Sequence, residues 1–144
     1  MKKDSEGEIR LTENCTDNVI MNNLIYALSD RDIFIRKYTA TGDRNEIGYN
    51  LYFSPGQKVQ KWFWDGKEYT DFAEWQKASG DKNSVYNVDP QLKNKGVEKP
   101  DLHLLSESPV RNVGFIMSGA IIGEYDIDGD KRIGDNKINI GADQ

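Results

Sequence analysis

The apolar residues in the first half of the chain gather in short runs that are separated by polar turns. Runs of this length, rich in β-branched and aromatic residues, are typical of short strands. We expect such strands at five places, namely Val19–Met21, Leu24–Tyr26, Ile33–Ile35, Glu46–Gly48 and Leu51–Phe53. The pattern therefore predicts a β-rich first half.

Two of these runs repeat each other. Asn23-Leu24 matches Asn50-Leu51 at an offset of 27 residues, and Tyr26 matches Phe53 in the same register. A segment of this length holds two or three short strands with their turns. Stacked coils would place each Asn at an equivalent turn, where it could bond to its counterpart. We therefore expect Leu24 and Leu51 to face inward on neighbouring coils; the alternative is a chance match between turn asparagines.

Residues 58–80 depart from this repeat. An Asp-Gly pair at 65–66 favours a tight hairpin turn, which would place Trp62 opposite Tyr69. A short helix within residues 71–80 should follow, since Asp and Glu residues suit a capping box and a Gly ends it. We interpret this segment as a lateral hairpin–helix insertion that packs against the side of the stacked coils.

The rest of the chain is rich in turns. We expect its strands at Leu102–Leu105, Phe115–Met117, Ala120–Ile122 and Ile138–Ile140. The length of 144 residues favours a single domain over 1–144, in which residues 115–144 form a C-terminal cap.

Four stretches match, in the same order, motifs of a known family: Tyr49-Asn50-Leu51-Tyr52, residues 64–76, residues 88–109, and residues 126–143 with their Asp-Ile-Asp-Gly-Asp and Ile-Gly-Ala-Asp sequences. From about Asn18 to Asp143 the chain resembles the C-terminal part of bacterial right-handed parallel β-helix proteins, the pectate-lyase-like superfamily. One departure is Lys131, where the family usually has proline. The resemblance implies an all-β fold, a right-handed parallel β-helix of few coils with the lateral insertion.

The same resemblance implies a link to carbohydrates. The superfamily includes lyases, hydrolases, epimerases and adhesin stalks, and its catalytic residues usually lie on earlier coils. We therefore expect the non-catalytic C-terminal portion of a polysaccharide-processing or carbohydrate-binding protein. The alternative is an intact polysaccharide lyase or glycoside hydrolase that acts on an acidic polysaccharide, so the question of enzyme activity stays open.

The net charge and the N-terminal sequence indicate which binding partners and which cellular location to expect. The net charge of −5 is spread along the chain, which disfavours nucleic acid and anionic lipid as partners, and no apolar stretch is long enough to span a membrane. The sequence carries no export signal, although the resemblance implies a secreted or cell-surface bacterial protein. We expect the open N-terminal end of the stack to be covered by residues 8–12 or by a second chain in a homodimer.

Aromatic residues of the insertion are candidates for a carbohydrate site. Trp62, Trp64 and Tyr69 could bind sugar rings through their faces if they were exposed. The alternative, which we favour, is a small core that joins the hairpin to Trp75 of the helix.

Acidic residues near the C-terminus invite a calcium interpretation. Asp126, Asp128 and Asp130 have the spacing of the first calcium ligands, but Lys131 and Lys137 stand at later positions of such a loop. We therefore favour a turn stabilised by Asp side chains over a calcium site, and expect no cofactor.

Catalysis through histidine would have to use His103, because the chain has 1 histidine. Its place within an apolar strand favours a solvent-facing alternate position instead. The sequence identifies no catalytic residue.

Overall fold

The computed structural model describes residues 7–30, 32–96, 98–118 and 122–143. Short strands dominate it, with one α-helix and a 3₁₀ turn. In chain order the elements are β1 (Ile9–Leu11), β2 (Val19–Met21), β3 (Leu24–Tyr26), β4 (Ile35–Lys37), β5 (Glu46–Gly48), β6 (Leu51–Phe53), η1 (Pro55–Gln57), β7 (Trp62–Trp64), β8 (Lys67–Tyr69), α1 (Phe72–Ser79), β9 (Val85–Tyr86), β10 (Leu92–Asn94) and β11 (Asp101–Leu104).

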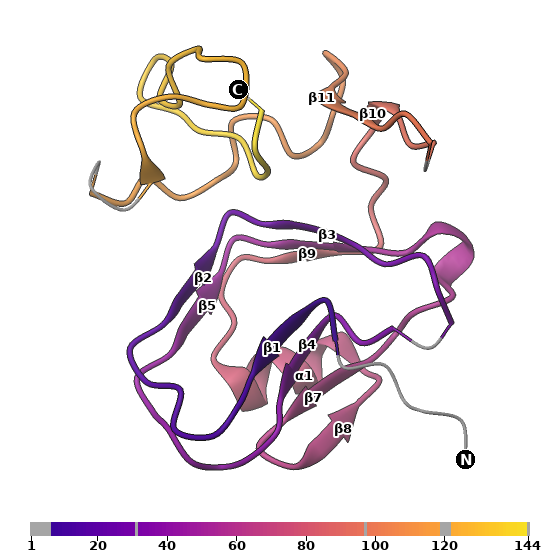
Figure 1. Ribbon diagram of the computed structural model, residues 1–144, viewed down its shortest axis with the longest axis vertical. Coiled ribbons are helices and arrows are strands. Elements are labelled where there is room, and N and C mark those ends of the chain that lie inside the picture. The colour runs from indigo at the N-terminus through magenta and orange to yellow at the C-terminus, as the bar shows by residue number, and fades with distance from the viewer. Residues whose placement is uncertain (1–6, 31, 97, 119–121, 144) are drawn as a thin grey trace.

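Parallel pairing joins strands that are distant in sequence. β1 pairs with β4 and β4 with β7, β2 pairs with β5, and β3 pairs with β6 and β6 with β9. We call β1 to β3 the first winding, β4 to β6 the second, and β7 to β9 the third. Each winding lies against the one before it, so strands of successive windings run side by side (Figure 1).

The repeat expected from the sequence is confirmed by the register. Leu24 pairs with Leu51 across β3 and β6. The side-chain amide of Asn23 donates to Oδ1 of Asn50 at 3.0 Å, across 27 residues. In the third winding Ser84 takes the same place, because its Oγ accepts the backbone N–H of Asn50 at 2.9 Å.

The residue that precedes each of Asn23, Asn50 and Ser84 has a left-handed backbone conformation. Asn22, Tyr49 and Asn83 stand at equivalent corners, with φ angles of 59°, 52° and 56°. A second ladder occupies another corner, where the Asn18 amide donates to Asn45 Oδ1 at 2.8 Å. The sharp bends between sheets thus recur at fixed positions, and partly buried amide ladders satisfy some of their polar groups.

The interior of the windings is an aromatic core that includes Tyr52, Trp62 and Trp75, each 0% exposed. The rings of Trp62 and Trp75 stack with centroids 5.9 Å apart, and Trp75 meets Tyr52 edge to face. Phe72 packs on Tyr52 and Trp62 from the same helix. α1 therefore covers the interior at the third winding.

The predicted hairpin and helix are confirmed in detail. Trp62 pairs with Tyr69, and Asp71 caps the helix by accepting the backbone N–H of Glu74 at 2.9 Å. Their placement differs from the prediction. β7 belongs to the third winding, and α1 packs into the interior core rather than against the side of the stack. The insertion lengthens the third winding, so Asn50 and Ser84 are 34 residues apart.

The expectation that Leu24 and Leu51 face inward is wrong. In the sheet of β3, β6 and β9 these two residues lie on the face opposite Tyr52, where Leu92, Val110 and Ile140 cover them. All of β6 is buried, because one face meets the interior and the other meets the C-terminal segment. A strand buried on both faces is apolar throughout, so its sequence does not distinguish inside from outside.

Residues 87–96, 98–118 and 122–143 form this outer layer, which lies beside the sheet of β3 and β9 (Figure 1). The strand expected at 102–105 is confirmed as β11, which pairs antiparallel with β10. Residues 115–117 and 138–140 are not strands, contrary to expectation. Ala120 and Ile121 lie outside the described residues. The described residues of the expected C-terminal cap, 115–118 and 122–143, belong to this layer, in which Ile140 packs against the face of the sheet that carries Leu51.

The first winding has open sheet edges. β1, β2 and β3 each pair with a strand of the second winding, and no other strand of the described residues pairs with them. Residues 8–12 do not fold over this end as a cap, since Ile9–Leu11 is itself the first strand. No helix in the described part of the chain is long and apolar enough to cross a membrane.

Candidate functional site

His103 lies at the centre of the clearest cluster of charged side chains. On β11 its neighbour Leu102 is the exposed residue, at 51%, while the His103 side chain is 33% exposed and points to the other face. His103, which we expected to face solvent, is thus partly exposed and contacts the carboxylates of Asp101 and Asp128. Leu102 and Leu104 lie on the other face of β11, as strand alternation requires, and of these two Leu102 is exposed while Leu104 is buried.

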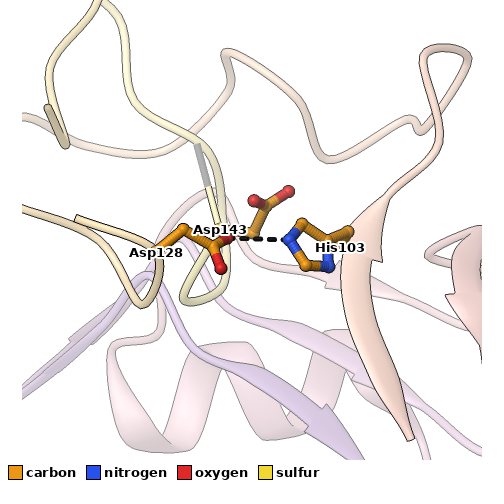
Figure 2. Close-up of side chains that lie close together, drawn as sticks. All are labelled: His103, Asp128 and Asp143. Atoms are coloured by element: carbon orange, nitrogen blue, oxygen red, sulfur yellow. Dashed lines mark ion pairs between the residues drawn. The ribbon is translucent and has the colours of Figure 1, made fainter. Parts of the chain in front are cut away.

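Three segments meet at this histidine. His103 Nε2 lies 2.7 Å from Oδ2 of Asp128, and Nδ1 contacts the carboxylate of Asp101. Asp143, which is 7% exposed, accepts the backbone N–H of Leu104 at 3.0 Å. One side-chain atom each of His103, Asp128 and Asp143 lies within 4.8 Å of the others. Figure 2 shows the three side chains converging from β11, a turn and the C-terminal end.

The turn that presents Asp128 is built by a neighbouring aspartate. Asp126 Oδ1 accepts the backbone N–H groups of Asp128 at 3.0 Å and Asp130 at 2.9 Å. This is the side-chain-stabilised turn that we favoured over a calcium loop. Of the three aspartates, Asp128 belongs to the possible metal-ligand group found in the described residues, and its companions are His103 and Asp143.

Electrostatics follow from this packing. Hydrogen bonding to Asp101, and more weakly to Asp128, raises the pKa of His103. The same contact with His103 lowers the pKa of Asp101. The cluster can therefore hold an imidazolium between carboxylates, or it can give up that proton and coordinate a cation through Nε2. Asp101 and Asp143 were not singled out from the sequence as site residues.

A cavity of about 650 Å³ adjoins the cluster, because its lining includes Asp143 as well as Leu102 and Leu104 of β11. Its wall is largely apolar and includes Leu24, Tyr26 and Leu102. Lys95 and Arg132 add positive charge to the lining. The cavity lies between the first winding and the β10–β11 hairpin, so only the tertiary fold creates it.

The aromatic candidates for sugar binding do not form a surface site. Trp62 is 0% exposed and Trp64 is 7% exposed, so neither offers a ring face to a ligand. Tyr69 is half-buried, and Nζ of Lys67 lies 4.7 Å from its ring centroid. The core interpretation is confirmed, and carbohydrate binding by Trp62 and Trp64 is a prediction that the structure corrects.

Comparison with known proteins yields a distant relative. No family model matches the chain, and no solved structure matches it. A protein of Bacillus subtilis (strain 168), described as the uncharacterized protein YwoF, is 29% identical over 108 residues. The match covers 74% of this chain but 22% of that protein, so the chain is similar to about a fifth of a longer relative.

Proposed function

We propose that this chain is the non-catalytic C-terminal portion of a right-handed parallel β-helix protein of bacteria, one that processes or binds polysaccharide. Its role is to terminate the stack of coils. The observation that carries the proposal is the set of parallel pairings, in register, between strands of successive windings. Stacked coils of a solenoid pair in this way, each with its neighbours only.

The two ends of the stack support a terminating role. At the third winding α1 places Phe72 and Trp75 over the interior aromatic core. At the first winding no strand of the described residues, other than those of the second winding, pairs with β1, β2 or β3. One end is therefore sealed by side chains, while the other offers backbone groups to another strand.

The carbohydrate assignment rests on the resemblance of four ordered sequence stretches. A secreted or cell-surface location belongs to the same proposal. Of the candidate aromatic residues, Trp62 and Trp64 are buried in the core, which favours a structural over a sugar-binding role for this portion.

A substitution pair tests the terminating role. Phe72→Asp should put a charge into the covered end, so that the interior becomes accessible and the chains self-associate. Ala73→Asp is the matched control, because it adds the same charge at the neighbouring, exposed helix position. We expect larger species by light scattering and stronger binding of a hydrophobic dye for Phe72→Asp alone. Equal behaviour of the two variants would contradict a sealing role for α1.

The open edges point to a partner of matching chemistry, a second copy of this chain. We propose a homodimer that joins first windings edge to edge. Light scattering over a range of concentrations should show a dimer that dissociates on dilution. A stable monomer at every concentration would rule out this assembly.

The alternative function is an intact polysaccharide lyase or glycoside hydrolase acting on an acidic polysaccharide. The observation that favours it is the cavity with Lys95 and Arg132 in its wall, since cationic side chains suit acidic sugars. Incubation with an acidic polysaccharide should give no unsaturated sugar product and no new reducing ends if the chain is non-catalytic. Turnover that is lost in Arg132→Gln would support the alternative.

A further inference from the structure

The C-terminal layer of the molecule has few regular elements to hold it together. Between β11 and Asp143 the described residues are largely turns and loops. Its contacts include single backbone hydrogen bonds, such as the one from Ile140 N–H to Val110 at 3.0 Å. The cluster at His103 joins three parts of this layer, which are β11, the turn at 126–130 and the C-terminal end.

We propose that His103, Asp128 and Asp143 bind a divalent transition-metal ion that cross-links these three segments. The three ligand atoms already lie within 4.8 Å of one another, so small side-chain movements bring them to one ion. Three protein ligands leave coordination positions for water.

The donor set defines the class of metal. One imidazole nitrogen with two carboxylate oxygens suits zinc or manganese. Calcium and magnesium prefer oxygen ligands, so an imidazole at the centre of the site disfavours them. The proposed site is thus distinct from a calcium loop formed by Asp126, Asp128 and Asp130.

Asp101 prepares the histidine for this role. Its carboxylate contacts His103 Nδ1, and its Oδ1 also accepts the backbone N–H of His103 at 3.1 Å. A carboxylate on one ring nitrogen fixes the ring and the tautomer, and leaves Nε2 to the metal. In this structure Nε2 faces Asp128, which is the proposed neighbouring ligand.

Charge in the cluster also suits a cation. Asp101, Asp128 and Asp143 supply three carboxylates around one imidazole. Asp143 is 7% exposed, and a carboxylate removed from water is costly unless charge or hydrogen bonds compensate it. Arg132 donates at 3.4 Å to the backbone carbonyl of Ala142, so that hydrogen bond does not neutralise the carboxylates.

Metal binding by the purified chain tests the site. After equilibration with zinc chloride or manganese chloride and dialysis, we expect one equivalent of metal per chain by elemental analysis. His103→Gln and Asp143→Asn should each lower the affinity at least tenfold. Asp130→Asn should retain it, because this control removes the same charge from an exposed residue of the same turn. The melting temperature should rise on metal addition only in proteins that bind.

The histidine gives a second readout that does not depend on the variants folding. Because the chain has 1 histidine, its imidazole nitrogens give an unambiguous pair of NMR signals. Zinc should shift the Nε2 resonance of His103 at one equivalent while Nδ1 keeps its hydrogen bond. Unchanged imidazole signals at saturating zinc, or equal metal retention by wild type and His103→Gln, would overturn the proposal and leave the cluster as an ion-pair network.

Discussion

Replacing Trp75 with alanine removes the side chain that most directly joins α1 to the windings. Trp75 is 0% exposed, and it stacks on Trp62 while meeting Trp64 edge to face at a centroid distance of 5.5 Å. Its Nε1 donates to Asp81 at 3.1 Å. The substitution therefore empties a large core volume and removes a donor from a buried carboxylate.

The expected loss of unfolding free energy follows from the buried ring area of Trp75 and from its hydrogen bond to Asp81. Burial of roughly 150 Å² of apolar ring surface at about 25 cal/mol per Å² gives about 4 kcal/mol. Lost aromatic contacts and the lost donor would add to this, and partial collapse of the cavity would subtract from it. We expect Trp75→Ala to lower the free energy of unfolding by about 4 kcal/mol, a large part of the stability of a small domain.

Urea unfolding followed by circular dichroism measures this change. Trp75→Phe is the matched control, since it keeps most of the ring packing and loses the bond to Asp81, for an expected cost of about 1–2 kcal/mol. A loss below about 1 kcal/mol in Trp75→Ala would refute the claim that α1 is anchored in the interior core.

Two other buried polar groups give further predictions. Asn50→Ala should lower the free energy of unfolding by about 2–3 kcal/mol, because the Asn50 amide accepts from Asn23 and donates to the Ile20 carbonyl at 2.8 Å. Asn45→Ala, at a half-exposed corner, should lower it by less in the same denaturation assay. Burial raises the pKa of Asp81, so the folded state holds the carboxyl proton of Asp81 more tightly than the unfolded chain does. The resulting contribution of Asp81 to the free energy of unfolding is therefore lost as the pH rises through the folded pKa. The stability of wild type relative to Asp81→Asn should therefore increase as the pH falls from neutral toward the unfolded pKa of about 3.9, and a constant difference would contradict this assignment.

The sequence predicted the 27-residue period, the hairpin and the helix, whereas the strands expected at 115–117 and 138–140 are not formed. The 27-residue match of Asn23 with Asn50 was readable because one ladder repeats both an amide and apolar neighbours in a fixed register. The corresponding match of Asn18 with Asn45 was equally readable but was not used. The hairpin at Trp62 and Tyr69 followed from the chemistry of its Asp-Gly turn alone.

Placement of side chains inside or outside was harder to predict. Leu51 and Tyr52 are both apolar and both buried, so alternation in β6 gives no direction. The direction is set by residues such as Leu92 and Ile140, which reach the sheet from far along the chain. For the same reason the helix was expected on the side of the stack, although Trp75 enters the interior.

The charged cluster could not be predicted from local pattern. Leu104 and Asp143 are 39 residues apart and meet only in the folded chain. His103 and Asp143 both lie in stretches that carry the family resemblance, but nothing in either stretch indicates that they converge. The aspartates at 126–130 drew attention through their spacing, whereas the structure assigns Asp126 to a turn and Asp128 to the histidine.

Lengthening the stack by one winding tests the β-helix account most directly. A second copy of residues 18–44 inserted after Arg44 would repeat β2, β3 and β4 in the 27-residue register, and each new strand would find a parallel partner on both sides. We expect this variant to unfold in one transition with a higher denaturant midpoint and a larger m-value than wild type, because the added winding buries more surface. An insert of the same length with scrambled sequence should raise neither the denaturant midpoint nor the m-value. If the duplicated segment is cleaved by protease and leaves the unfolding transition unchanged, the strands do not form a stack of coils.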